Sequence, residues 1–359
     1  MRPLQRYRNN RDVWLELAPD FVHAVTTDDE TIDINAKQRY FTLIGIQYDF
    51  QECDKELVRY LFQQEISSLI NDDSTGTTDA LLLGAYLLAR YQDPIDIPLL
   101  HEAKHIDMDT GSGFDIEFMY WALKSQTHDY VRAHFPDLYE DIKDQKETDL
   151  FYENLDSWWL ERCSQHPANP TEESDYAMYE RHLYFGDLNQ ARKHVENWAR
   201  NEVNAKSTLV TLKYAYKSLG EYQDVIEILK IHLSEAKAGW DKVSVLSEML
   251  ETYVELKSPP EAFACFAQID AELSRFHNWK DVGLGRILVC AAFEYIALCE
   301  NNDLAMPACK LALSWFRELT SHTYVLLIAG EKATRRCQIL IHAEKFRQLA
   351  EVERKRIGI

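Results

Sequence analysis

Apolar residues recur every three or four positions along nearly the whole chain, whereas strict alternation of apolar and polar residues is scarce. This spacing is the period of an amphipathic helix with one face against a core. In the first half it predicts helices over 33–48, 54–70 and 80–91, with Asp33 as the N-cap of the first. The buried stripe of that first helix would be formed by Ile34, Phe41, Ile44 and Tyr48.

Helix-breaking residues are few, and they are clustered. The 359 residues include 12 Gly and 10 Pro, which favours long helices over a β-rich fold with many tight turns. The densest breaker segment is 163–174, with the sequence CSQHPANPTEES. We therefore expect an all-α chain with an N-terminal helical domain over 1–168, helix-pair repeats over 172–318 and capping helices over 319–359.

The second half of the chain repeats itself. The segments YFGDLNQARKHVENW and SLGEYQDVIEILKIHL align on Gly186 and Gly220, which are 34 positions apart. Glycine at this place supplies the left-handed turn that ends the first helix of a pair. Two further units, 245–270 and 291–316, keep the helix-pair pattern but lack the turn glycine. The spacing of the last unit is stretched, which predicts longer helices.

Apolar positions within these units predict which side chains pack between the helices. Around Gly186 they are Leu188, Ala191, Val195 and Trp198, and around Gly220 they are Leu209, Leu212, Tyr216, Tyr222, Val225 and Leu229. In the third unit they are Leu246, Met249, Tyr253, Ala262 and Phe266. The second helix of that unit is expected to begin at Pro259-Pro260, because Pro is favourable in the first turn of a helix.

The period, the turn glycine and this packing pattern resemble the tetratricopeptide repeat family. The resemblance covers about 172–318 and implies an α-solenoid, a right-handed superhelix whose concave groove holds peptides or partner helices. In that family the first helix of each pair lines the groove, which makes Tyr179, Lys213 and Tyr214 the expected partner-binding residues. The N-terminal half is similar to HEAT-like helical pairs, because 81–105 reads as two helices joined at Asp-Pro.

Charge is distributed unevenly along the chain. The total is −20, and a net charge of +4 in 320–359 leaves −24 for the first 319 residues. Such an acidic body repels nucleic acid and anionic membranes and favours a basic protein or peptide as partner. There is no run of about 18 apolar residues, and the first residues lack the apolar core of a secretory signal, so we expect a cytoplasmic protein.

The cysteines point to the same compartment. There are seven of them, an odd number without a C-x-x-C pair, and several lie in apolar helical runs. This usage predicts buried free thiols in a reducing environment. The positions are Cys53, Cys163, Cys265, Cys290, Cys299, Cys309 and Cys337.

One motif with catalytic associations is present, the segment His101-Glu102-Ala103-Lys104-His105. In zinc peptidases with the pattern H-E-x-x-H, two histidines one helical turn apart hold the metal and the glutamate activates the bound water. A zinc hydrolase with His101 and His105 as ligands and Glu102 as base is therefore one hypothesis. Its third ligand would have to be Glu117, which is close along the chain, or Glu140.

A second interpretation of this motif is structural. The helix that carries it would be short, from Pro98 to about Asp107, and its apolar arc is formed by Leu99, Leu100, Ala103 and Ile106. On a helical wheel the two histidines lie almost opposite that arc. They are then expected to be an exposed pair beside Lys104, with neither a metal nor any other cofactor.

The segment DMDTGSG that follows resembles an ion-binding loop only superficially. An EF-hand loop needs a glutamate at its twelfth position, and counting from Asp107 this position is Phe118. We interpret Asp107, Asp109, Gly111 and Gly113 as an Asx-type loop that ends one helix and leads to the next at Phe114.

The leading hypothesis on function is a non-enzymatic binding protein whose acidic surface holds a basic protein partner. One concrete form is an immunity or antitoxin protein that neutralises a cationic toxin, since acidic inhibitors gain association rate from electrostatic steering. The alternatives are the zinc hydrolase and a tetratricopeptide-type regulatory sensor that binds a signalling peptide.

Overall fold

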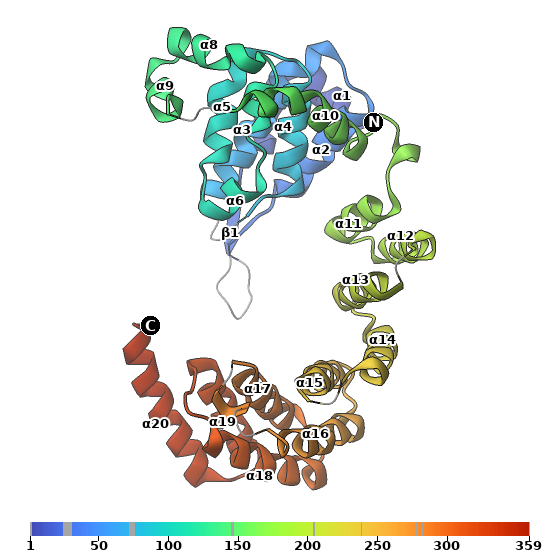
Figure 1. The fold of residues 1–359 in the computed structure, drawn as a ribbon, viewed down its shortest axis with the longest axis vertical. Helices are drawn as coiled ribbons and strands as arrows, with labels where there is room; N and C mark the ends of the chain where they lie inside the picture. Colours follow the sequence, from blue (N-terminus) through green and yellow to red (C-terminus); the bar gives the residue numbers. More distant parts are fainter. Residues whose placement is uncertain are drawn as a thin grey trace. The chain divides into compact units, whose positions relative to one another are not determined.

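In a computed structural model the chain is almost entirely helical, and its contacts divide it into two compact units, Met1–Ser174 and Asp175–Ile359 (Figure 1). The structure describes residues 2–23, 31–71, 76–144, 147–203, 205–237, 239–276, 279–281 and 283–358. The predicted all-α class and the helix-pair organisation are confirmed. The division of the second half into repeats and a separate capping region stays a prediction.

The first unit combines longer helices with short helical turns. Its helices and 3-10 turns are α1 (Arg2–Asn9), η1 (Arg11–Leu17), α2 (Ala36–Tyr48), η2 (Glu52–Asp54), α3 (Lys55–Asn71), α4 (Asp79–Ala89), η3 (Pro94–Asp96), α5 (Ile97–Lys104), α6 (Met108–Gly113), α7 (Glu117–Tyr120), η4 (Lys124–Gln126), α8 (Thr127–His134), α9 (Pro136–Ile142), α10 (Asp149–Gln165) and η5 (Pro170–Glu172). The strands β1 (Phe21–His23) and β2 (Thr31–Asp33) form an antiparallel pair in which Phe21 lies opposite Asp33.

Helix α4 is the centre of the first unit. It packs on α2 and α3, and its side chains are buried on nearly every side. A helix that is apolar all round has to be covered by other helices. Gly84 allows a close approach to α3, because a Cβ at this position would lie 2.9 Å from the Phe62 ring.

The sequence-based description of the first helix was wrong in register. Helix α2 begins at Ala36, and Asp33 is the last residue of β2 rather than a helix cap. Ile34 and Phe41 are exposed, and the buried face instead holds Arg39, Tyr40, Thr42, Leu43, Ile46 and Gln47. The physical reason is an ion pair: the Arg39 guanidinium donates to the Asp33 carboxylate over 2.6 Å and turns this face of α2 inward.

The second unit is a series of consecutive helix pairs. The pairs are α11 (Asp175–Phe185) with α12 (Leu188–Asn201), α13 (Ala205–Ser218) with α14 (Tyr222–Glu235), α15 (Trp240–Glu255) with α16 (Pro259–Leu273), α17 (Gly283–Leu298) with α18 (Asn302–Glu318), and α19 (Tyr324–Arg336) with α20 (Leu340–Ile357). A short 3-10 turn, η6 (Trp279–Asp281), precedes α17. We call the first member of each pair a first helix and the other a second helix.

From the third pair onward the pairs stack in a regular way. First helices contact first helices, α15 with α17 and α17 with α19, and the second helix α16 contacts α18. This arrangement, in which each pair buries its apolar face on its neighbours, is that of a helical-repeat protein. Helices α17 and α18 are longer than those of the first two pairs, as the stretched spacing predicted.

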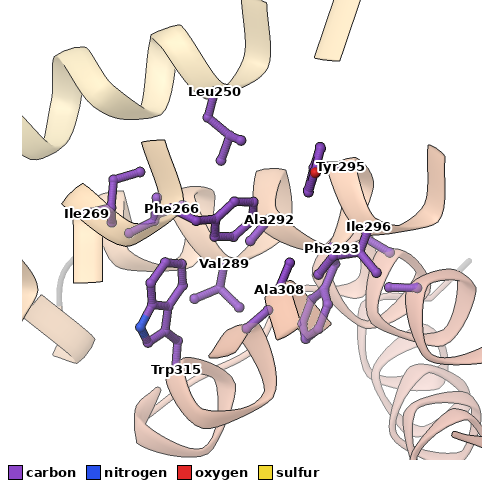
Figure 2. Close-up of a cluster of buried hydrophobic side chains, with 14 of the residues drawn as sticks. Leu250, Phe266, Ile269, Val289, Ala292, Phe293, Tyr295, Ile296, Ala308 and Trp315 are labelled. Carbon is purple, nitrogen blue, oxygen red and sulfur yellow. The ribbon is translucent and has the colours of Figure 1, made fainter. Parts of the chain in front are cut away.

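The core of the second unit lies between these stacked pairs. Phe266 of α16 is fully buried, with its ring centroid 5.3 Å from that of Tyr295 on α17 and 5.7 Å from that of Trp315 on α18. Figure 2 shows it among Leu250, Val289 and Ala292.

The packing predicted for the third unit is confirmed at Leu246, Met249, Ala262 and Phe266, and α16 begins at Pro259. In α13 the prediction was less accurate. The predicted residues Leu209, Leu212 and Tyr216 are half-buried, whereas the helix buries Thr208 and Ala215.

The same left-handed turn ends the first helix in four of the five pairs. Gly186 and Gly220 have φ angles of 83° and 73°, and Lys257 and Gln338 adopt the same conformation with 52° and 58°. In each turn the next amide donates to a carbonyl five residues back, as in Asp187 N to His182 O at 2.8 Å and Ile339 N to Thr334 O at 2.8 Å. This is the Schellman geometry. The turn between α19 and α20 therefore matches those of the earlier pairs.

We expect glycine to stabilise the two turns that lack it. A left-handed conformation costs a residue with a Cβ about 1 kcal/mol, so Lys257→Gly and Gln338→Gly should each raise the free energy of unfolding by up to about 1 kcal/mol. Gly186→Ala should lower it by about 1–2 kcal/mol through the backbone conformation, because beyond its two chain neighbours no residue comes within 4 Å of the added Cβ. Urea unfolding followed by circular dichroism measures all three.

Lys332→Gly is the matched control for these turn variants. Lys332 is an exposed residue inside α19, where glycine should destabilise by about 1 kcal/mol. Equal effects of Lys332→Gly and Gln338→Gly would contradict the left-handed turn at Gln338.

Candidate functional site

A pocket of about 380 Å³ opens on the first helices of the second unit. Three consecutive first helices build it: Glu251 comes from α15, Ile287, Cys290 and Glu294 come from α17, and Val325 comes from the start of α19. Thr323 also lines it and caps α19 by accepting from the amide of Leu326. First helices that contact one another thus present their side chains to one common surface.

The electrostatic centre of the pocket is Glu251. Its carboxylate is half-buried and forms no ion pair among the described residues. Burial raises the pKa of Glu251, the neighbouring Glu248 and Glu294 raise it further, and Lys217 acts in the opposite direction. A half-buried carboxylate beside two other acidic groups favours a bound cation.

The thiol of Cys290 is hydrogen-bonded and half-buried in the lining of this pocket. Its thiol donates to Glu294 Oε1 over 3.8 Å. Burial, reinforced by Glu294, raises the pKa of Cys290 to about 12. Since the thiolate is the reactive form of cysteine, this side chain stays an unreactive thiol at neutral pH.

Arg286 brings a positive charge to the same pocket. Its guanidinium donates to Ser321 Oγ over 3.0 Å, and no ion pair joins it to a carboxylate within the described ranges. The pocket thus has an acidic part at Glu251 and Glu294 and a basic residue at Arg286. Ile287 and Val325 supply apolar surface to its lining.

The structure does not bring the three predicted partner-binding residues into this pocket. Tyr179 on α11 is only 5% exposed and packs in a small core with Ala191, Val195 and Leu219. Lys213 on α13 is 7% exposed, and its ammonium group pairs with Glu248 on α15 over 2.5 Å. Tyr179 therefore joins a first helix to its second helix, Lys213 joins two first helices, and both have little surface for a partner.

Tyr214 differs from the other two predicted residues. It is 58% exposed, and the Lys213 ammonium group lies 4.5 Å from the centroid of its ring. Glu251, Glu294 and Arg286 were not singled out by the sequence, because charged residues on a helix usually face solvent. What could have found them is their place on first helices, and Glu251 also lies two positions from the predicted packing residues Met249 and Tyr253.

The histidine motif of the first unit lies at the end of a short helix. Helix α5 ends at Lys104, so His105 follows the last helical residue. The two imidazole centroids are 4.0 Å apart, and His105 Nδ1 donates to the carbonyl of His101 over 2.8 Å. Burial lowers the pKa of His101, and His105 lowers it further. His105 is exposed as expected, whereas the expectation was wrong for His101, which is half-buried with its Nε2 enclosed.

Among the residues that the structure describes, no third metal ligand accompanies this pair. Within the described ranges no three His, Cys, Asp or Glu side chains are arranged to hold a metal ion, and this includes Glu117 and Glu140. Glu102 is exposed. Among the described residues the motif thus forms a pair of tilted, contacting imidazole rings at the end of a short helix.

Lys104 and the segment after it have structural roles. The Lys104 ammonium group donates to the carbonyl oxygens of Gly111 over 2.6 Å and Phe114 over 2.5 Å. The segment predicted as a loop is helix α6, which Asp107 caps by accepting from the amide of Thr110 over 2.7 Å. The loop prediction was wrong because the glycines serve close packing: a Cβ at Gly111 would lie 2.9 Å from the backbone oxygen of Lys104.

The state of the cysteines and the apolar character of the helices can also be compared with the sequence-based expectations. All seven cysteines are free thiols, with Cys265, Cys299, Cys309 and Cys337 buried and Cys53 exposed. In the part of the chain that the structure describes, no helix combines the length and the apolar character that crossing a membrane requires.

Fold and surface together define an all-α helical-repeat protein with a pocket on its first helices. Comparison with known proteins gives no relative: no family model, no curated protein and no solved structure matches the chain.

Proposed function

We propose that the second unit is a tetratricopeptide-like solenoid that binds a basic segment of a protein partner on its first helices. The observation that carries the proposal is Glu251, a half-buried carboxylate without an ion pair among the described residues, in a pocket made by three stacked pairs. A lysine or arginine side chain suits it. The aliphatic stem would pack on Ile287 and Val325, and the charged end would reach Glu251 and Glu294.

The charge of the whole chain supports the same type of partner. The first 319 residues carry −24, which follows from the total of −20 and the +4 of the remainder. A field of this sign speeds the approach of a cationic protein and is screened by salt. One version of the proposal is an immunity or antitoxin protein that neutralises a basic toxin.

Fluorescence anisotropy with a labelled lysine- and arginine-rich peptide tests the proposal. The wild-type chain should bind this peptide at low salt and should not bind an acidic peptide of equal length. Glu251→Gln should weaken binding about tenfold, because the peptide's cation then lacks its half-buried partner. Binding should also weaken as the pH falls from about 7.5 to about 5, since burial raises the pKa of Glu251 and protonation removes its charge.

Glu318→Gln is the matched control. It makes the same charge change at an exposed position at the end of the second helix α18. It should change the affinity by less than about twofold. If both variants weakened binding equally, the net charge and not the pocket would hold the peptide, and the proposed site would be wrong.

A further inference from the structure

A larger cavity, of about 590 Å³, lies in the first unit and has no part in the function proposed above. Two parts of the chain build it, the end of α4 with Tyr86 and Arg90, and the end of α10 with Trp159, Cys163 and the following His166. Its volume is that of pockets that hold small organic molecules.

One wall of this cavity is aromatic and consists of Tyr86, Trp159 and His166, with Trp121, which does not line the cavity, stacked on Trp159. The Trp159 centroid is 4.6 Å from Trp121 and 5.2 Å from Tyr86, with interplanar angles of 17° and 27°. His166 continues the series, 4.7 Å from Tyr86. Because each ring is held by the next, the wall is rigid, and its aromatic surface favours a flat or apolar ligand.

Arg90 supplies a positive charge to the lining of this cavity. No ion pair joins its guanidinium to a carboxylate within the described ranges, although most arginines of this acidic chain are paired. Instead it lies 3.7 Å from the centroid of the Phe50 ring, which fixes its position. Glu172 also lines the cavity but is exposed and makes no ion pair with Arg90. A fixed guanidinium without a carboxylate is a binding group for an oxyanion.

A polar group accompanies Arg90 in the lining. The Tyr86 hydroxyl hydrogen-bonds with Cys163, which also lines the cavity, and burial together with Cys163 raises the pKa of Tyr86. Gln92, which also lines the cavity, has a φ of 49°, a left-handed conformation in the turn where the chain leaves α4.

We propose that this cavity binds a small molecule that joins a flat ring to a carboxylate or phosphate group. The ring would lie against the wall of Tyr86, Trp159 and His166, and the oxyanion would accept hydrogen bonds from Arg90. The aromatic wall and Arg90 both belong to the first unit, so this proposal can be tested separately from the binding of a basic partner.

Isothermal titration calorimetry with the full chain tests it with three probes. Indole-3-acetate carries the carboxylate, adenosine monophosphate carries the phosphate, and indole-3-acetamide has the same ring as the first without a charge. At least one of the two anions should bind with a Kd of about 1 mM or tighter, and indole-3-acetamide about tenfold or more weakly than indole-3-acetate if the carboxylate is the ligand group. The anion that binds with the lower Kd shows whether the site prefers a carboxylate or a phosphate.

Arg90→Gln should abolish the binding of the preferred anion. Arg11→Gln, the same charge change at an exposed position of the first unit, should leave it unchanged. Failure of both anions to bind at about 5 mM, equal binding of indole-3-acetate and its amide when adenosine monophosphate does not bind, or equal effects of the two variants would each overturn the proposal.

A second measurement avoids any variant. Cys163 lines the cavity, whereas Cys53 is exposed and is not among the residues that line it. A saturating concentration of the preferred anion should slow the alkylation of Cys163 by iodoacetamide at least about threefold and leave Cys53 unaffected, as followed by peptide mass spectrometry. Equal alkylation of Cys163 with and without the anion would place the bound molecule outside the cavity and contradict the proposal.

Discussion

Replacing Arg39 by Met should lower the free energy of unfolding of the first unit by about 3–5 kcal/mol at neutral pH. The Arg39 side chain is fully buried on α2 and joins two carboxylates from different elements, Asp33 of β2 over 2.6 Å and Glu65 of α3 over 2.5 Å. Without it, both acidic groups remain buried without a counter-charge. Removing one partner of a buried ion pair costs far more than the pair contributes.

The other contacts of Asp33 explain why the loss of the Arg39 guanidinium would affect several elements. Its carboxylate also accepts from the Ser68 hydroxyl over 2.7 Å and from the amides of Asp20 and Asn35 over 3.0 Å. These hydrogen bonds stabilise the ionised form and, with Arg39, keep the pKa of Asp33 low despite its burial. Loss of Arg39 therefore disturbs the hairpin, α2 and α3 together, and hydrogen exchange should show faster exchange in all three.

The effect of Arg39→Met should depend on pH through Glu65. Burial raises the pKa of Glu65 even in the wild type, and Arg39 opposes this shift. In the variant the pKa should rise further, so the folded state binds more protons than the unfolded state, and stability falls as the pH increases. The difference from wild type should be larger at about pH 7.5 than at about pH 5.5.

Urea unfolding at both pH values measures this prediction, with Arg347→Met as control. Arg347 pairs with Glu344 on the surface of α20 over 2.8 Å, and both side chains are about half exposed. Such surface pairs contribute about 0.5 kcal/mol or less. A cost for Arg39→Met as small as that for Arg347→Met would contradict the buried ion pair.

Phe266→Ala should cost the second unit about 3–5 kcal/mol. The fully buried ring touches side chains of α17 and α18 as well as its own pair, so its removal leaves a cavity between stacked repeats (Figure 2). Stacking between neighbours is what stabilises a helical-repeat protein. We therefore expect faster hydrogen exchange from α15 to α18, whereas α2 to α4 of the first unit should be unchanged.

Leu298→Ala provides the comparison for Phe266→Ala. Leu298 is a large apolar residue at the end of α17, but it is 69% exposed. Its truncation should change the free energy of unfolding by less than about 0.5 kcal/mol. A small effect of Phe266→Ala in urea unfolding would show that the repeats are not coupled through this residue.

The sequence located the helices of the second half because each one carries a 3.6-residue apolar stripe that its neighbours bury. It found the turns at Gly186 and Gly220, since glycine marks a left-handed residue. It missed the same turn at Lys257 and Gln338, where the stacking of the helices imposes a conformation that the residue type does not favour.

Binding sites were harder to predict from the sequence than helices were, for a related reason. Tyr179 and Lys213 were correctly assigned to first helices, but the rotation of each helix and its distance from the next decide whether such a residue is buried, paired or exposed. Glu251 joins Cys290 and Val325 only because α15, α17 and α19 stack side by side. Likewise, Arg90 and Trp159 share a cavity although 69 positions of sequence separate them.

By itself the sequence determined the class of this protein, its helix pairs and its acidic charge, because these depend on local periodicity and on composition. Only the tertiary structure decided which charged groups are buried. It placed Arg39 between two carboxylates, left Glu251 and Arg90 without an ion pair among the described residues, and packed His101 beside His105 without a third ligand there. The physical reason is that the energy of a charge depends on its distance to other charges and to water, and both are set by packing between segments far apart in the chain.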